Sequence, residues 1–197
     1  MQALIDALMS EEQSMPWKNT DSRYGNLSIA LHWLMLVLLI IVYCCIEFRG
    51  QFPKGSGGRA LIVEFHYMLG LTVFALVWLR LVARAIGVAP KIVPTPPTWQ
   101  RLLSKLMHIA LYLFMIATPL LGWLVVSGQG HQVMFYGIDL PTLIAENRPL
   151  AKEIKGWHEL AGTLGYWLIG LHALAGLYHH YGVRDNTLAR IMPKLHR

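Results

Sequence analysis

The chain has 197 residues, of which 55% are hydrophobic and only 14% are charged, and its mean hydropathy is +0.44. Soluble domains usually contain about 25% charged residues, so this composition excludes an ordinary soluble protein. The formal net charge of +6 is better explained by membrane topology than by nucleic acid binding, because the basic residues flank apolar blocks.

Residues 1–24 precede the first apolar block. Asp6, Glu11 and Glu12 stand where a secretory signal needs basic residues, and no long apolar core follows them. We therefore expect a cytoplasmic N-terminal extension, either as a short amphipathic helix or as a loosely ordered tail.

Four apolar blocks follow, and each reaches the roughly 20 residues that a hydrocarbon core of about 30 Å requires. They predict an all-α fold, an integral membrane four-helix bundle within residues 25–182. The expected spans are residues 25–47, 60–83, 102–127 and 153–181. Gly- and Pro-containing segments separate them, the longest at 127–149. Residues 183–197 are expected to form a cytoplasmic tail.

The distribution of Lys and Arg predicts the orientation of the bundle. Six basic residues lie on the side of the second and fourth span starts: Arg49, Lys54, Arg59, Arg148, Lys152 and Lys155. Eleven lie on the opposite side: Lys18, Arg23, Arg80, Arg84, Lys91, Arg101, Lys105, Arg184, Arg190, Lys194 and Arg197. The excess marks the cytoplasmic side, so both termini are predicted to be cytoplasmic.

The fourth span carries two histidines on one face. His158 and His172 are 14 residues apart, which is about 21 Å along a helix and nearly a whole number of turns. Ionisable residues inside a membrane are costly and mark function. His66 is expected to meet His158 near the outer face, and His32 to meet His172 near the inner face. Two such pairs suit two stacked b haems, because bis-His ligation favours electron transfer.

Cys44 and Cys45 are adjacent, and no C-x-x-C-H motif occurs in the chain. A covalently attached c-type haem is therefore excluded.

Other residues near these histidines have two interpretations each. His108 reaches the depth of the inner pair, either as a competing ligand or as a hydrogen-bonding neighbour of a propionate, a carbonyl or a quinone. Arg80 follows His66 by 14 residues, either to pair with propionates or as a snorkelling charge at a helix end. Gly162 and Gly165 leave space for a flat macrocycle or for close helix packing.

The chain resembles the bacterial di-haem cytochrome b561 family over roughly residues 23–195. The resemblance is carried by four stretches, at residues 28–33, 47–53, 157–173 and 179–193. It implies that His32 and His172 bind the inner haem iron, and that His66 and His158 bind the outer one. The family is similar to the cytochrome subunits of membrane hydrogenases and formate dehydrogenases, and it implies a location in the bacterial inner membrane.

One branch of this family resembles a superoxide oxidase. The resemblance then implies that superoxide gives its electron to the outer haem and that ubiquinone is reduced from the inner haem. Arg59 and Lys155 flank the outer pair and are expected to steer the superoxide anion, unless they are ordinary loop charges. His179, His180, Lys105 and Asp185 are expected at a quinone site, or else as hydrogen-bonding groups for lipid or propionates.

Two other functions remain open. The same haems would serve a cytochrome b subunit that anchors a hydrogenase or dehydrogenase and takes its electrons. A haem-free transporter would use the histidines as a proton relay, and its purified protein would be colourless.

Overall fold

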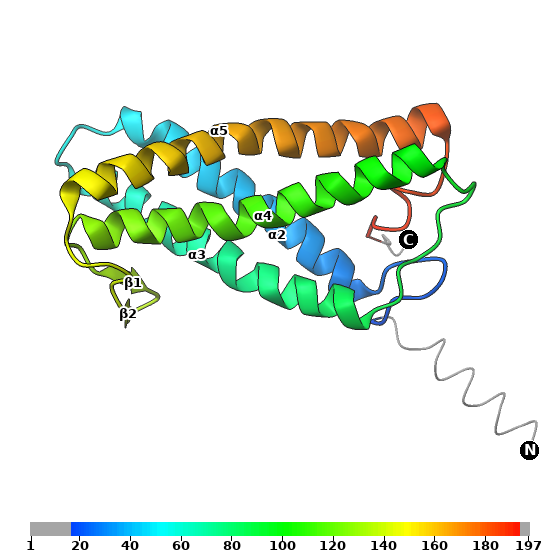
Figure 1. Cartoon of the computed structure of the whole chain (residues 1–197), viewed down its shortest axis with the longest axis horizontal. Coiled ribbons are helices and arrows are strands. Elements are labelled where there is room, and N and C mark those ends of the chain that lie inside the picture. Colours follow the sequence, from blue (N-terminus) through cyan, green and yellow to red (C-terminus); the bar gives the residue numbers. More distant parts are fainter. Residues whose placement is uncertain (1–16, 194–197) are drawn as a thin grey trace, which may run out of the picture.

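Four long helices form an antiparallel bundle, with a short β-hairpin at one end (Figure 1). The structure is a computed structural model that describes residues 17–193; residues 1–16, in the predicted N-terminal extension, and residues 194–197 lie outside the described part. The helices are α2 (Asn26–Phe48), α3 (Gly57–Ile86), α4 (Thr98–Gly128) and α5 (Arg148–Tyr178). The short elements are η1 (Arg49–Gln51), β1 (Val133–Phe135), β2 (Ile138–Leu140) and η2 (His179–Val183).

All four helices are long and apolar enough to cross a membrane, which confirms the predicted fold class. Helices α3, α4 and α5 begin three to five residues before the expected spans, and capping groups extend α3 and α5. The Ser56 hydroxyl accepts a hydrogen bond from the Arg59 N–H at the start of α3. The Asn147 side chain accepts one from the Leu150 N–H at the start of α5, so that helix starts five residues before the expected span.

Most apolar side chains face outward. Leu113 is 62% exposed and Trp167 is 69% exposed, although both lie within spans. Such exposure is costly in water and favourable in hydrocarbon. The bundle is therefore built to be surrounded by lipid.

A small buried cluster lies between the two histidine levels. Met35 of α2, Val73 and Val77 of α3 and Met115 of α4 pack together there. Each of these four residues lies, along its own helix, between a position near the inner histidines and a position near the outer histidines. The cluster therefore separates the two ends of the bundle.

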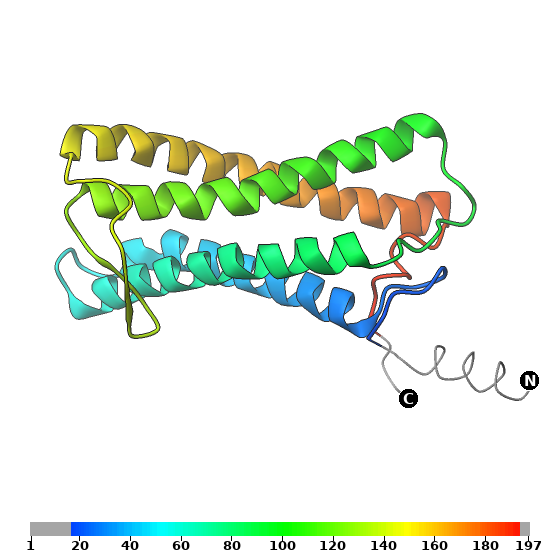
Figure 2. The same ribbon diagram turned by 60° about the horizontal axis from the view of Figure 1, so that its bottom comes forward.

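We call the end with η1 and the α4–α5 loop the outer end, following the predicted orientation, and the opposite end the inner end. Both ends of the described chain lie at the inner end, beside the loop between α3 and α4 (Figure 2). The residues after α5 pack beneath the bundle: the Trp33 indole N–H donates to the Ile191 carbonyl (2.9 Å), and the Arg190 guanidinium donates to the Pro90 carbonyl. The described part of the tail is thus packed against the inner end of the bundle.

The α4–α5 loop contains the β-hairpin, which the sequence analysis did not anticipate. Val133 pairs with Leu140 and Phe135 pairs with Ile138 in antiparallel register. Tyr136 and Gly137 both have positive φ angles, 48° and 84°, as a two-residue type I′ turn requires. The sequence did not predict this turn, because tyrosine rarely occupies a position with positive φ.

Candidate functional site

The outer histidine pair bridges α3 and α5. The ring centroids of His66 and His158 are 6.1 Å apart. Two imidazoles that share one metal ion at bond lengths of about 2 Å have ring centres about 6 Å apart. The separation therefore fits a single metal ion held between the two rings.

Backbone carbonyls orient both outer imidazoles. His66 Nδ1 lies 3.1 Å from the Val42 carbonyl oxygen, and His158 Nδ1 lies 2.9 Å from the Thr118 carbonyl oxygen. A carbonyl only accepts hydrogen bonds, so Nδ1 donates and Nε2 keeps its lone pair for a metal. Gly122 leaves room for the His158 ring, which would lie 3.2 Å from a Cβ at that position.

A cavity of about 330 Å³ opens beside this pair. Helices α2, α3, α4 and α5 all contribute to its wall, and apolar side chains predominate. Its polar lining includes His66, Tyr67, Tyr43, Tyr166, Glu47, Arg49, Lys155, His158 and Glu159. The predominantly apolar lining and the paired imidazoles fit a large apolar group that carries an iron, so His66 and His158 are the residues that would hold an outer haem.

Tyr43 and Tyr166 of the cavity lining each donate a hydrogen bond. The Tyr43 hydroxyl donates to the Gly162 carbonyl at 2.7 Å, and the Tyr166 hydroxyl donates to Glu47 at 2.7 Å. Gly162 lines the cavity. A Cβ at Gly165 would instead collide with the Tyr43 hydroxyl and the Phe114 ring, so this glycine allows close packing against both side chains.

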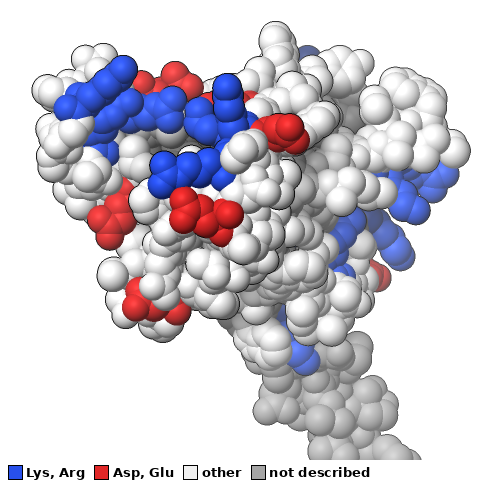
Figure 3. All heavy atoms as spheres, turned by 60° about the vertical axis from the view of Figure 1, so that its left-hand side comes forward, with Lys and Arg blue, Asp and Glu red and all other residues white. Residues whose placement is uncertain are grey.

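The predicted superoxide-steering residues have different surroundings. The Lys155 ammonium lines the cavity and lies 2.9 Å from Glu159. Arg59 donates to the Arg49 and Phe52 carbonyls, so its guanidinium also holds the turn between α2 and α3. Arg49, which the sequence analysis did not single out, lines the cavity itself. Lys and Arg side chains gather over this end of the molecule (Figure 3).

The inner end brings three imidazoles together. The His172 ring centroid lies 6.2 Å from that of His32 and 5.4 Å from that of His108. The distance between His32 and His172 again fits two ligands of one metal ion. His108 Nδ1 lies 2.6 Å from the Ser104 carbonyl oxygen, so its Nε2 is also free.

Arg80 contacts the inner pair directly. Its Nη2 lies 2.8 Å from His32 Nδ1. A guanidinium only donates, so His32 Nδ1 accepts here and the ring proton sits on Nε2. His32 and His172 would hold an inner haem through Nε2 once Arg80 releases Nδ1, and a haem propionate is a suitable acceptor for that guanidinium.

The proposed quinone residues are only partly brought together. His179 Nδ1 lies 2.6 Å from Asp185 Oδ2, and the Asp185 carboxylate is fully buried. Burial disfavours ionisation of Asp185, but hydrogen bonds from His179 and Thr187 outweigh it and hold its pKa below the ordinary value. His180 and Lys105 are exposed.

Comparison with known proteins identifies close relatives of the chain. A family described as prokaryotic cytochrome b561 matches residues 23–194. The chain is 40% identical to "Cytochrome b561 homolog 1" of Escherichia coli strain K12 over 173 residues, 88% of this chain and 98% of the relative. It is 36% identical to "Probable superoxide oxidase CybB" of Yersinia pestis over 172 residues, which cover 87% of this chain and 97% of that protein.

Proposed function

The chain belongs to the prokaryotic cytochrome b561 family of transmembrane electron-transfer proteins of the bacterial membrane, and we propose that it oxidises superoxide at the outer end and reduces ubiquinone at the inner end. The observation that carries the proposal is the presence of two imidazole pairs, with ring centroids 6.1 and 6.2 Å apart, at two levels of one bundle. Two b haems, one at each pair, would supply the one-electron redox chemistry.

The reaction balances over two turnovers of the outer end. Two superoxide anions each lose one electron and leave as O₂, while one ubiquinone takes up two electrons and two protons to become ubiquinol. The outer end needs no proton, whereas the inner end must supply two. His179, hydrogen-bonded to buried Asp185, is a suitable group to pass protons at the inner end.

The outer end suits a small anion. Arg49 and Lys155 line the cavity beside the outer histidines together with the carboxylates of Glu47 and Glu159. Arg59 at the nearby turn brings these five groups to a net charge of +1, three positive charges against two negative ones. Positive charge in a cleft raises the local concentration and the association rate of an anionic substrate. The similarity to the Yersinia pestis relative, which is named as a probable superoxide oxidase, also supports the proposal.

Stopped-flow mixing of the purified protein with superoxide tests the proposed donor. We expect superoxide to reduce the wild-type haem faster than it dismutes. Changing Arg49 and Lys155 together to Gln should slow the reduction several-fold, and added salt should slow the wild type more than the double variant. Lys54→Gln is the matched control, because Lys54 is exposed and lies outside the cavity lining.

Haem content separates a steering defect from a folding defect and should be unchanged in these variants. His179→Ala should leave reduction by superoxide fast but lower the turnover with a ubiquinone analogue. If superoxide does not reduce the wild-type haem, the proposed donor is wrong, and an anchor subunit for a hydrogenase or dehydrogenase becomes the better account.

A further inference from the structure

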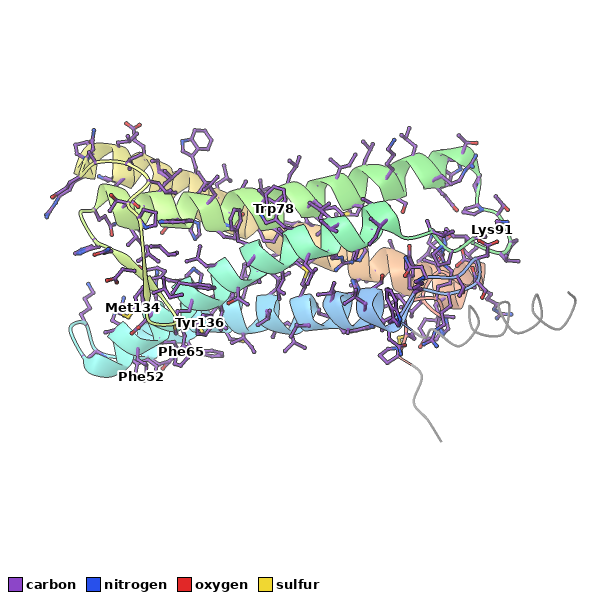
Figure 4. The ribbon with its side chains drawn as sticks, turned by 90° about the horizontal axis from the view of Figure 1, so that it is seen from below. Phe52, Phe65, Trp78, Lys91, Met134 and Tyr136 are labelled. Carbon is purple, nitrogen blue, oxygen red and sulfur yellow. The ribbon has the colours of Figure 1, made fainter. Side chains whose placement is uncertain are left out.

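The β-hairpin presents apolar side chains away from the protein. Met134, Tyr136 and Ile138 are 52%, 60% and 64% exposed. In Figure 4, Met134 and Tyr136 lie at the same end of the molecule as the exposed rings of Phe52 and Phe65. Apolar side chains grouped in this way on a connecting loop indicate an interaction surface.

The hairpin rests on the side of the bundle. The Tyr136 hydroxyl lies 3.1 Å from the Thr72 hydroxyl, and Thr72 is near the midpoint of α3. The Trp123 indole N–H donates to the Pro141 carbonyl at 3.1 Å, which ties the end of the hairpin to α4. The hairpin therefore lies alongside membrane-spanning helices.

The unfavourable backbone conformation at Tyr136 indicates that the contacts of its side chain offset a cost in the turn. Its φ of 48° belongs to the left-handed region, which favours Gly, Asn or Asp in a type I′ turn. A tyrosine there is unfavourable for the backbone. Its ring is apolar and its hydroxyl is hydrogen-bonded to Thr72, so the side chain is able to enter hydrocarbon without leaving a polar group unpaired.

We propose that the outer leaflet of the membrane covers this face. The hairpin backbone lies at the boundary between headgroups and hydrocarbon with Met134 and Ile138 against lipid, and the Tyr136 side chain reaches from it along α3 toward Thr72. The surface is continuous with the lipid-facing side of α3, where Phe65 is 43% exposed. Three side chains are too few for a protein partner, which needs roughly 800 Å² from each side.

Two polar features fix the depth of the hairpin. Asp139 pairs with Met134 across the two strands and is exposed, and a carboxylate is costly in hydrocarbon. The outer edges of a two-stranded sheet also need hydrogen-bonding partners, which hydrocarbon lacks. The boundary between the hydrocarbon core and the headgroup zone, which adds roughly 5–7 Å on each side of the core, satisfies both requirements.

The hairpin also contributes to the outer cavity. Val133 is 4% exposed, packs in one cluster with Leu71 and Val126, and lines the cavity. The same short element therefore contacts lipid on one side and closes part of the cavity wall on the other. The proposal depends on the membrane-spanning fold and not on haem or superoxide.

Spin labels on the full chain in lipid nanodiscs test the proposal. Cys44 and Cys45 are first changed to Ala, and single cysteines are then introduced by Ile138→Cys and, as a water-exposed reference, Lys54→Cys. We expect oxygen, which partitions into lipid, to relax the label at 138 more strongly than a water-soluble nickel chelate. The label at 54 should show the opposite order, with several-fold greater access to nickel.

Tyr136→Asn in the Ile138→Cys background is the second measurement. Asn suits the turn backbone better than Tyr, so the hairpin should persist, but loss of the ring should raise the nickel access of the label. Equal nickel access at 138 and 54 would show a loop in water and overturn the proposal. Shielding from both reagents would show a protein cover and overturn it too, and an unchanged label in Tyr136→Asn would overturn the role of Tyr136.

Discussion

The two histidine pairs have almost the same separation but different surroundings. At the outer end, backbone carbonyls of Val42 and Thr118 accept from Nδ1 of both rings. At the inner end, Arg80 donates to Nδ1 of His32, and a third imidazole, that of His108, lies 5.4 Å from His172.

This difference concerns preorganisation. The outer pair already presents two free Nε2 atoms beside a cavity, whereas His32 must exchange its hydrogen-bond partner before its Nε2 can bind a metal. A site whose groups are already oriented pays less free energy on binding. The outer pair is thus already oriented for ligation, whereas ligation by the inner pair requires the Arg80–His32 hydrogen bond to be exchanged.

The largest expected effect is the loss of a haem from one end. If two haems bind as proposed, His66→Ala or His158→Ala should reduce the haem content from two to one per chain and leave the inner haem, because the outer haem would lose one of the two histidines that hold it. His32→Ala or His172→Ala should do the reverse. A pyridine haemochrome assay with low-temperature optical spectra measures the count and the site.

Two further variants make that comparison decisive. His131→Ala changes an exposed histidine outside the helices and should retain both haems. His108→Ala should also retain both, with an altered potential. If His108→Ala loses a haem while His32→Ala keeps both, His108 is the inner ligand and the proposed inner pair is wrong.

Replacing Arg80 should change the midpoint potential of the inner haem and leave that of the outer haem unchanged. Arg80→Gln removes a positive charge beside the inner pair, and positive charge favours the reduced form of a nearby haem. We expect the inner midpoint potential to fall by on the order of 100 mV, since a unit charge several ångströms away is worth about 2 kcal/mol. A redox titration should show an unchanged outer haem; equal shifts of both haems would contradict the local role.

The smallest expected effect concerns two carboxylates, Asp185 at the inner end and Glu159 at the outer end. Because the folded-state pKa of Asp185 lies below its ordinary value of about 4, folding favours its ionised form. That stability is complete above the ordinary pKa and is lost as the pH falls through the lower folded pKa. Asp185→Asn should therefore lower the melting temperature at neutral pH and reduce the loss on acidification.

Glu159→Gln is the matched variant at the outer end. Glu159 and Lys155 are about half exposed, so their pair should contribute little to stability. Thermal melts in detergent between pH 3 and 7 measure both variants. A destabilisation by Glu159→Gln equal to that by Asp185→Asn would contradict the comparison.

The long apolar blocks were sufficient to predict the four helices, because the length of a span follows from the thickness of the hydrocarbon core. The helix ends were less predictable, since Ser56 and Asn147 extend α3 and α5 by capping them. The hairpin was missed because its turn uses Tyr136 where such turns favour Asn or Gly.

The sequence by itself determined the class of protein, the number of spans and the depth of each histidine. Depth follows from counting residues along a helix, and each residue adds a fixed rise. For the same reason, the spacing of His158 and His172 predicted two levels on α5.

Only the tertiary structure decided which side chains from different helices meet. It placed Arg49 in the cavity wall, directed Arg59 to the carbonyls of the turn, and set Arg80 against His32. Residue counting gives depth but not the rotation of one helix against another, and that rotation comes from the packing of Met35, Val73, Val77 and Met115.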